Sequence, residues 1–495
     1  MKVVHPTNDE SLASYHRPEL LALLPGLELA LDCWNLLDTN GRGSEKAKYL
    51  HKEVGEPLAA YKERLHRSTY TPIYRDSIRA YAGLLSRFQL FKAPPSLTES
   101  EQNVDMQGSS IHSFWNSCDE LAIRDGGVFI MVDMPPKDKE LEGNYVDEKR
   151  VGRTPHMIQI ERRDVINWSV EYLRGREKIN HVTIRQVRSK PNPKGYGSVI
   201  EPVYLVLRPG SVETIRLEKR DNKWMQFSEG AVPTSLPVVP IRWYGASSPR
   251  FAQGDLPMNG LAELSIQHYQ MRSDLQELLH KCAMPVPVRK GAPVGVNGRR
   301  APLVIGPNTA VDLDGGSESG FTFAEPSGKS LERHQAEINH VEALMDRSGL
   351  NFLYGANIKT ATEASLRASQ ISSQVSSLIR NKTSSFVGVM RLWAAYAGEL
   401  ASLTAESGIA INDSLINRPI DPSGIAQLIN LHTNGLLSKQ TVLDELQRGG
   451  VLDPDMKIEL ELERVKGEEP KVEARPAPPP VGTRVAMPPA VTVRR

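Results

Sequence analysis

Three neighbouring residues, Gly328, Lys329 and Ser330, match the last positions of a phosphate-binding P-loop and open a predicted helix. The motif also needs a glycine five residues before Gly328, and that position is Phe323. Without this glycine the backbone cannot curl its amide groups around a phosphate. We therefore interpret the segment as a helix that begins after a glycine turn, and we expect no nucleotide site.

Histidine and cysteine spacing gives no metal site either. His334 and His340 lie six residues apart on one predicted helix, whereas metal-binding pairs on a helix lie four apart and share a face. Cys33, Cys118 and Cys282 are far apart and form no CxxC motif, which excludes a zinc module and a disulfide framework. The sequence predicts solvated or interfacial histidines and a reduced chain without metal or cofactor.

Known catalytic motifs are missing from the chain. It has no GxSxG, HExxH, GxGxxG or DxDxDG sequence, and its many carboxylates include no pair that the sequence itself holds together for acid–base work. A chain of 495 residues that catalysed acyl or phosphoryl transfer would usually carry one such motif. We therefore predict a structural or binding role with no catalytic residues, and an enzyme with an unrecognised site is the alternative.

Composition sets further bounds on the chain. Hydrophobic residues make up 40% and charged residues 24% of the 495 positions, as in globular proteins, and this length predicts two to four substructures. The formal net charge of +1 argues against a protein that grips nucleic acid by bulk charge. The N-terminus has no apolar signal segment, and no run of 18 apolar residues occurs. We expect neither secretion nor a membrane span.

Hydrophobic periodicity divides the first half into helices followed by strands. Residues 1–40 are weakly patterned, and Asp125-Gly126-Gly127 forms a turn signal before a buried strand. Short alternating runs over residues 155–228, the first at 156–160, predict an antiparallel β-meander. The other predicted elements are helices at 45–67, 75–88 and 115–123 and strands at 128–132 and 238–244.

The second half is mainly helical. A helix over 259–283 and another over 331–347 flank a segment rich in Gly and Pro, with strand-like runs VPVRK and APLVI at 286–290 and 301–305. We expect the two helices to pack as an antiparallel pair with the β-insert at their far end. A very long helix follows Gly355, and its apolar stripe runs through Val375, Leu378, Lys382 and Phe386.

The remaining faces of this long helix are rich in Ser, Gln, Asn and Thr, which favours contact with neighbouring chains. Shorter helices are predicted at 425–431 and 439–448, with Ser438 as the cap of the second. Residues 467–495 contain seven prolines and few large apolar side chains, so we expect disorder there. The sequence thus predicts an α+β protein.

Several phrases, taken in order, resemble the portal (head–tail connector) proteins of tailed double-stranded DNA bacteriophages. They lie at residues 74–84, 122–135, 240–244, 256–288, 360–364 and 435–442. The resemblance spans about residues 45–465, and its weight lies in the order of the phrases. The first forty residues and the proline-rich tail depart from the pattern.

This resemblance implies the phage portal fold, with a wing, a two-helix stem, a small β clip, a long channel-proximal helix and a helical crown. The implied parts are the N-terminal region and wing with the β-meander (1–255), stem helix 1 (256–284), clip (285–328), stem helix 2 (329–349), channel loop and long helix (350–410), crown (411–466) and disordered proline-rich tail (467–495).

The function implied is that of a ring, typically of twelve copies, at one capsid vertex. Such a ring is the conduit for double-stranded DNA during packaging and ejection. Its partners would be the terminase large subunit, the head–tail adaptor, and capsid and scaffolding proteins, and its location the virion after assembly in the host cytoplasm. A near-neutral chain suits a conduit, since each neutralised phosphate adds affinity and friction.

The resemblance also assigns candidate functional residues. The loop over residues 350–360 would face the channel and DNA through Asn351, Tyr354 and Lys359, with Gly355 allowing a bend. The clip carries a basic group that could contact DNA or an acidic surface of the motor or adaptor, or be merely solvated: Arg289, Lys290, Arg299 and Arg300. Another virion or scaffold protein is the nearest alternative reading of the whole chain.

Overall fold

The computed structural model describes most of the chain as two compact units, Met1–Ile416 and Asn417–Arg495. Helices and antiparallel sheets mix along the first unit, which confirms the α+β class, whereas the described part of the second unit has helices only. The residues described are 5–36, 44–135, 153–192, 195–282, 286–291, 320–324, 329–348, 361–411 and 422–448, with the single positions 313, 316, 452, 458, 461, 462 and 464.

The N-terminal helices differ from the sequence prediction in two places. A helix that the weak pattern of residues 1–40 did not predict, α1 (Pro18–Trp34), contains Pro25. The single helix predicted over 45–67 is wrong, because the chain forms α2 (Ser44–Tyr49) and α3 (Leu58–Arg67). Between them Gly55 adopts φ +83°, and Pro57 has an extended backbone, so neither continues a helix.

The next helix, α4 (Ile73–Leu85), confirms the prediction but ends three residues early, and Phe88 begins strand β1 (Phe88–Phe91). After the short α5 (Pro95–Glu99), the chain enters α6 (Ile111–Asp125), where the Ser110 hydroxyl accepts a hydrogen bond from the Ser113 amide at 3.2 Å. Helix α6 ends at Gly126, whose left-handed backbone, φ +76°, turns the chain into the next strand.

A three-stranded antiparallel sheet forms the centre of the first unit. Its order is β3–β2–β9, with β2 (Gly127–Asp133) between β3 (His156–Glu161) and β9 (Ile241–Gly245). The predicted strands at 128–132 and 238–244 are confirmed, the second beginning at Ile241. Residues 127–132 are all buried, as the continuous apolar run predicts.

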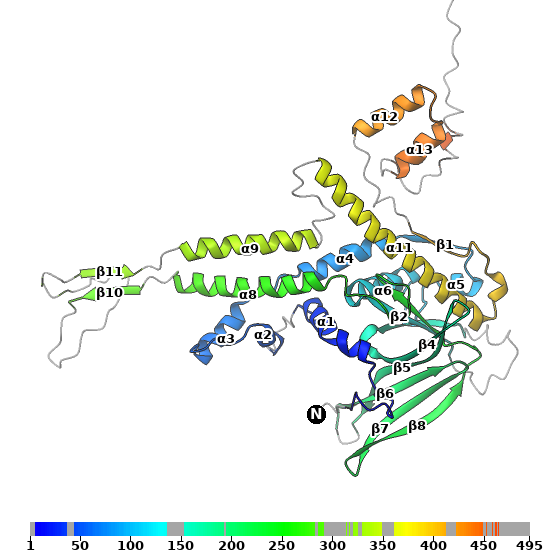
Figure 1. Cartoon of the computed structure of the whole chain (residues 1–495), viewed down its shortest axis with the longest axis horizontal. Coiled ribbons are helices and arrows are strands. Elements are labelled where there is room, and N and C mark those ends of the chain that lie inside the picture. The colour runs from blue at the N-terminus through cyan, green and yellow to red at the C-terminus, as the bar shows by residue number, and fades with distance from the viewer. Residues whose placement is uncertain are drawn as a thin grey trace, which may run out of the picture. The chain divides into compact units, whose positions relative to one another are not determined.

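The predicted meander is confirmed as a five-stranded sheet in consecutive order, visible in Figure 1. The first predicted run, at 156–160, belongs instead to the central sheet as β3 and is separated from β4 by the 3₁₀ turn Arg162–Asp164. The strands of the meander are β4 (Val165–Leu173), β5 (Arg176–Pro191), β6 (Ser198–Arg208), β7 (Ser211–Arg220) and β8 (Lys223–Pro233).

The N-terminal residues and α1 share a hydrophobic core with one face of this meander. Leu12, Leu20 and Leu27 pack in one cluster with Tyr204 and Ile215. His5 is held there as well, since its Nδ1 atom lies 2.7 Å from the Tyr204 hydroxyl. The segment before α1, which has no clear pattern in the sequence, therefore covers part of the sheet.

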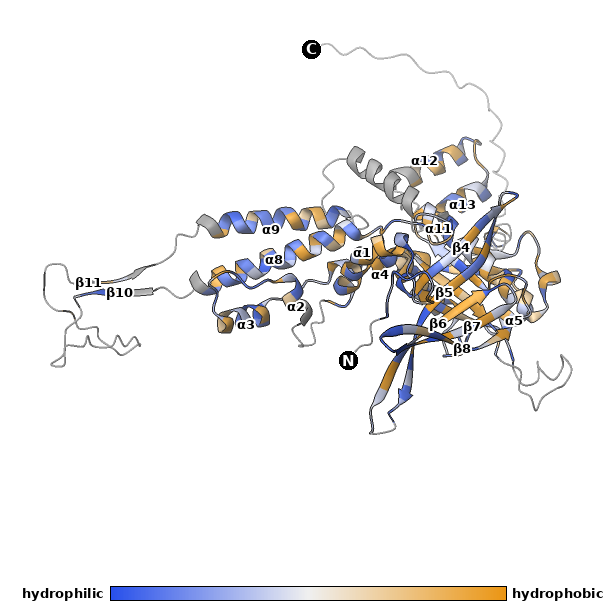
Figure 2. Cartoon of the chain, turned by 60° about the horizontal axis from the view of Figure 1, so that its bottom comes forward, coloured by the Kyte–Doolittle hydropathy of each residue, from blue (hydrophilic) through white to orange (hydrophobic). Residues whose placement is uncertain are grey.

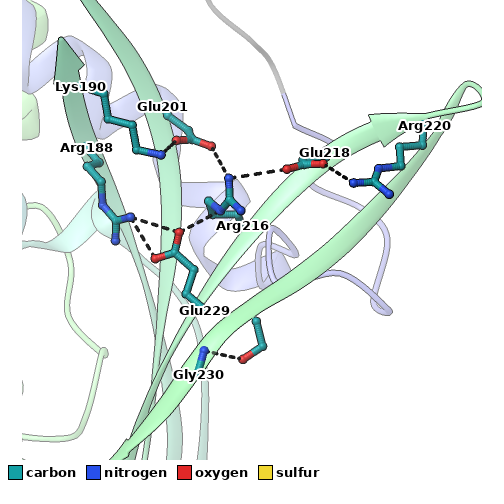
Figure 3. Close-up of polar contacts among 9 residues, drawn as sticks. Arg188, Lys190, Glu201, Arg216, Glu218, Arg220, Glu229 and Gly230 are labelled. Atoms are coloured by element: carbon teal, nitrogen blue, oxygen red, sulfur yellow. Dashed lines mark hydrogen bonds and ion pairs between the residues drawn. The ribbon is translucent and has the colours of Figure 1, made fainter.

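Opposite charges alternate across the strands of the meander, as Figure 3 shows. Glu229 accepts a hydrogen bond from Arg188 at 2.9 Å and forms an ion pair with Arg216 at 2.8 Å. Lys190 donates to Glu201 at 2.8 Å, and Glu201 lies 3.7 Å from Arg216. Cross-strand pairs of this kind stabilise the sheet modestly, and here they match Arg188, Lys190 and Arg216 with glutamates of the same chain.

A pair of helices and a β-hairpin follow the central sheet. Helix α8 (Asn259–Cys282) leads to β10 (Val286–Lys290), which pairs with β11 (Gly320–Ala324) before α9 (Lys329–Ser348). Both helices are confirmed, and so is strand character at 286–290. The predicted strand at 301–305 lies outside the described residues, and the observed partner of β10 is β11.

The predicted long helix is α11 (Ala361–Ala397), which packs on the central sheet and on β12 (Gly408–Ile411), the partner of β1. The short 3₁₀ turn Leu400–Ser402 lies between α11 and β12. Phe386, Met390 and Trp393 of α11 join Trp115 of α6 and Tyr244 of β9 in one buried cluster. The stripe read from the sequence is therefore the buried side of this helix.

The second unit contains α12 (Pro422–Thr433) and α13 (Lys439–Arg448), which pack against each other. The predicted cap is confirmed, since the Ser438 hydroxyl accepts from the Thr441 amide at 3.1 Å. The tail, residues 467–495, lies outside the described residues, so its disorder stays a prediction. Among the described helices, none is long and apolar enough to cross a membrane.

Candidate functional site

Two of the seven candidate residues lie in the described part of the chain. Arg289 and Lys290 end strand β10, where they pair in register with Phe321 and Gly320 of β11. Lys290 is exposed and Arg289 is half-buried. The remaining candidates lie outside the described residues, so their roles stay predictions: Asn351, Tyr354 and Lys359 of the channel loop, and Arg299 and Arg300 of the clip.

The hairpin that carries Arg289 and Lys290 is connected to an antiparallel pair of helices. His268 of α8 lies 3.0 Å from Glu342 of α9, and the Met271 carbonyl lies 2.8 Å from His334. The later residue of α8 meets the earlier residue of α9, so the two helices run in opposite directions, as predicted. Figure 1 shows the β10–β11 hairpin beyond the ends of this pair.

The two histidines of α9 fit their predicted roles. His334 bonds to the backbone of α8, which is an interfacial role, and His340 is exposed. Figure 2 shows hydrophilic and hydrophobic residues interleaved along α8 and α9. The apolar ones that are fully buried on α9, Ile338, Val341 and Met345, recur at helical spacing, which aligns the pair along one seam.

Helix α3 supports α8 from another side. The Ser68 hydroxyl, just after α3, donates to the Ser273 hydroxyl at 2.8 Å, and both serines are buried. Arg67 forms an ion pair with Glu277 one turn further along α8. The half of α8 that lies nearer the hairpin is therefore held by polar contacts with α3.

A buried ion pair anchors the long helix α11. Lys382 and Asp119 of α6 are both fully buried, and the Lys382 ammonium donates to Asp119 at 2.6 Å and to the Leu85 carbonyl at 2.7 Å. The Tyr244 hydroxyl donates to the other Asp119 oxygen at 2.8 Å. Desolvation raises the pKa of Asp119 to about 6, although the Lys382 charge opposes that rise.

Lys382 also lies 4.8 Å from the centre of the Phe88 ring, so its charge contacts an aromatic face. This cluster was not predicted from the sequence. Its signal was a lysine in the apolar stripe of α11, at a position where an exposed charge would not be expected. Buried charges are nearly always paired, so that position called for an acidic partner.

A second polar feature lies where α11 meets strand β9. Arg242 of β9 and Arg380 and Arg391 of α11 line one hollow together with the small residues Thr383, Ser384 and Gly388. We call this hollow the arginine groove. Desolvation and the nearby Arg391 charge both lower the pKa of Arg242, while the Glu177 charge raises it. Arginines in such a place suit carboxylate or phosphate ligands, which their planar groups bind in a bidentate manner.

The described residues contain no catalytic arrangement that we recognise. Among them, no three His, Cys, Asp or Glu side chains are grouped closely enough to hold a metal ion. Cys33 and Cys118 are buried free thiols, and burial raises the pKa of Cys33 to about 12, which keeps it protonated and unreactive. What the geometry provides is a set of positioned surfaces: the hairpin, the arginine groove and the charged meander.

Comparisons with known proteins give a family match and structural matches. A family model described as Domain of unknown function (DUF4055) matches residues 257–397, which run from α8 to the end of α11. No curated protein sequence matches the chain.

The structural matches are to gene transfer agent (GTA) particles. A chain of "Virion of native gene transfer agent (GTA) particle" is 13% identical with a TM-score of 0.40, covering 81% of this chain and 96% of that chain. A chain of "Neck of empty GTA particle computed with C6 symmetry" is 13% identical with a TM-score of 0.38 and the same coverage. For "Neck of native GTA particle computed with C12 symmetry" the identity is 12%, the TM-score 0.38, and the coverage 76% and 89%.

Proposed function

We propose that the chain is a portal subunit, a non-enzymatic virion protein that forms a ring at one capsid vertex of a tailed phage and through which double-stranded DNA passes. The observation that carries the proposal is the order of α8, the β10–β11 hairpin, α9 and α11 along the chain, with α8 and α9 antiparallel. This is the order of stem, clip, stem and channel-proximal helix that the sequence resemblance implies.

The charge of the chain supports a conduit rather than a tight DNA-binding protein. Its formal net charge is +1, and the arginines of the meander surface are matched by glutamates. Affinity for DNA rises with each phosphate that a protein neutralises, and so does its dependence on salt. A ring with few unmatched cations could hold the duplex and still let it slide.

The candidate residues have separate roles in this proposal. Lys359, with Asn351 and Tyr354, would face the DNA in the channel, and the clip cations would bind the terminase large subunit or the head–tail adaptor. Lys359→Ala should leave rings intact and alter DNA packaging. A double change, Arg299→Ala with Arg300→Ala, should weaken partner binding. Added salt should weaken the partner binding of the unchanged ring, because salt screens the same charges.

Electron microscopy of the purified full-length chain tests the proposal directly. A portal subunit should give rings, twelve-membered in the family, with an axial hole wide enough for a DNA duplex. Monomers, or shells and sheets without an axial hole, would instead favour another virion or scaffold protein. ATPase and nuclease assays on the same sample test the enzyme alternative, and activity in either would remove the non-enzymatic role.

A further inference from the structure

The arginine groove is built by one strand and one helix. Its volume is about 600 Å³, and its three arginines come from β9 and from two points of α11. Arg242, Arg380 and Arg391 all keep exposed surface, although the surrounding protein still desolvates Arg242, so the groove opens to the surface. Between Arg380 and Arg391, the residues of α11 that line the groove are Thr383, Ser384, Val387 and Gly388, none of which has a long side chain.

Gly388 makes room for Arg242. A Cβ atom at position 388 would lie 3.0 Å from the Arg242 Nε atom and 3.1 Å from its Cδ atom, closer than ordinary contacts. Glycine is a poor helix former, and here it stands well inside a 37-residue helix. The notch lets the Arg242 side chain lie against α11, so the guanidinium joins Arg391 in one hollow.

Within the described part of the chain the arginines of the groove form no ion pair, although the charge of Glu177 acts on Arg242. No ion pair or hydrogen bond to a carboxylate is formed there by Arg242, Arg380 or Arg391, in contrast to the arginines of the meander. Two of these like charges converge, which costs free energy unless an anion lies between them. The groove therefore has the chemistry of a site for carboxylates or phosphates.

The same chain carries a matching acidic segment. Residues 95–123 include Glu99, Glu101 and Asp105 and contain no lysine or arginine. Asp105 accepts hydrogen bonds from the backbone amides of Gln107 and Ser109, at 2.8 and 3.1 Å, which give the loop between α5 and α6 a defined shape. The Glu101 side chain is 34% exposed, and the His112 Nε2 atom lies 3.8 Å from its Oε1 atom.

The acidic loop and Arg242 of the arginine groove lie at opposite edges of the central sheet. The Val104 carbonyl accepts a hydrogen bond from the Met157 amide at 2.8 Å, which fixes the loop beside β3. Arg242 lies on β9, and the strand order is β3–β2–β9. A head-to-tail contact in a closed ring needs two different, complementary surfaces on opposite sides of each copy.

We propose that the arginine groove of one copy binds the acidic loop, residues 99–105, of the next copy, with Glu101 opposite Arg391. This inference rests on the proposed function, because it identifies the contact by which the ring subunits associate. Carboxylates are favoured over DNA phosphates because the chain itself supplies them at the facing edge. A DNA duplex presents a long array of phosphates, and three arginines could neutralise only a few of them.

Charge reversal gives a sharp test. R391E alone and E101R alone should each reduce the ring fraction at least tenfold at 50 mM salt, measured by light scattering after size exclusion. An equimolar mixture should restore rings. In that mixture each groove can meet a complementary loop: the E101R loop fits the R391E groove, and the unchanged loop fits the unchanged groove. R87E, at an exposed arginine outside the groove, is the matched control and should assemble normally.

Further measurements separate folding and DNA binding from assembly. G388A should displace Arg242 and weaken the ring without lowering the melting temperature, because alanine favours the helix. Single reversals that still form rings, or a mixture that does not recover them, would refute the contact while leaving the portal proposal intact. If R391E forms normal rings but binds a 30-base-pair duplex more weakly, the contact between subunits is refuted. The arginine groove would then be a site for DNA phosphates. If the unchanged chain forms no rings, the portal proposal fails, and sedimentation of the two reversal variants, alone and mixed, still tests the contact.

Discussion

The Lys382–Asp119 pair gives a quantitative prediction about how α11 is held. Lys382→Met keeps the length of the side chain and removes its charge. The change leaves the fully buried Asp119 with the Tyr244 hydroxyl alone, and it frees the Leu85 carbonyl. Removing one member of a buried pair costs about 3–5 kcal/mol, because the other charge stays desolvated. We expect the loss of unfolding free energy in K382M to fall within this range at pH 7.5.

The matched control is Lys48→Met. Lys48 pairs with Asp32 at the same distance, 2.6 Å, but its side chain is 48% exposed. Water screens such a pair, so this change should cost at most about 1 kcal/mol. Urea unfolding followed by tryptophan fluorescence measures both variants, since Trp115 and Trp393 lie in the core that α11 shares with α6.

The cost of K382M should also depend on pH. In the unchanged chain the pKa of Asp119 is raised to about 6. The Lys382 charge lowers the pKa of Asp119, so loss of the lysine raises that pKa further. In the folded variant Asp119 therefore takes up a proton at a higher pH than it does in the unchanged protein. In the unfolded chain Asp119 is still ionised at that pH. The folded variant therefore binds one more proton than the unfolded chain, and its stability increases as the pH falls. As the pH is lowered, the difference in unfolding free energy between K382M and the unchanged protein should decrease until about pH 6. Below that pH it should stay constant, because Asp119 then takes up a proton in both folded proteins.

Two results would refute this reasoning. A cost for K382M no larger than that for K48M would mean that water or rearrangement replaces the lysine at no expense. A cost that grows as the pH falls toward 6 would mean that Asp119 is not the group left unpaired. Equal urea m-values are required for the comparison, because a changed slope would report a different unfolding transition.

Three further predictions concern other parts of the fold. Gly126→Ala should lower unfolding stability by more than about 2 kcal/mol, measured by urea unfolding, because its Cβ would lie 2.1 Å from the Asp255 carbonyl at a left-handed backbone position. Arg216→Ala should cost about 1 kcal/mol or less at low salt and still less at 1 M salt, since its partners Glu201 and Glu229 are partly exposed; a loss that salt does not change would contradict the screening argument. Truncation after Val465 should leave the oligomer unchanged in light scattering, and loss of oligomers would show that the proline-rich tail takes part in assembly.

Elements with strong local patterns could be predicted from the sequence. Helix α8 and the buried strand β2 are each encoded within one continuous segment of the sequence, and both form as expected. The break between α2 and α3 was missed, although Gly55 and Pro57 mark it, because the apolar spacing continues across them. Helix α1 was missed because no clear periodicity precedes or follows Pro25.

Pairings between distant segments could not be predicted. The run at 156–160 was correctly read as a strand, but its membership of the central sheet depends on hydrogen bonds to β2. Lys382 and Asp119 are 263 positions apart, so nothing local in the sequence joins them. The arginine groove likewise depends on Gly388 of α11 and Arg242 of β9. In the sequence each is an ordinary residue of its own helix or strand, and nothing indicates that they lie together.

The α8–α9 pair acts mechanically as a lever. Near its start α8 is held in the core by the buried Leu261, Ala262 and Tyr269, whereas Leu279 and His280 near its end are exposed. A helix of 24 residues is about 36 Å long at the usual rise per residue. A tilt of α8 by about 5°, which would also shift the α3 contacts at Ser273 and Glu277, would displace the far end by about 3 Å, close to the length of one hydrogen bond. Small changes in the packing around Tyr269 would therefore move the β10–β11 hairpin by a distance that can make or break a hydrogen bond.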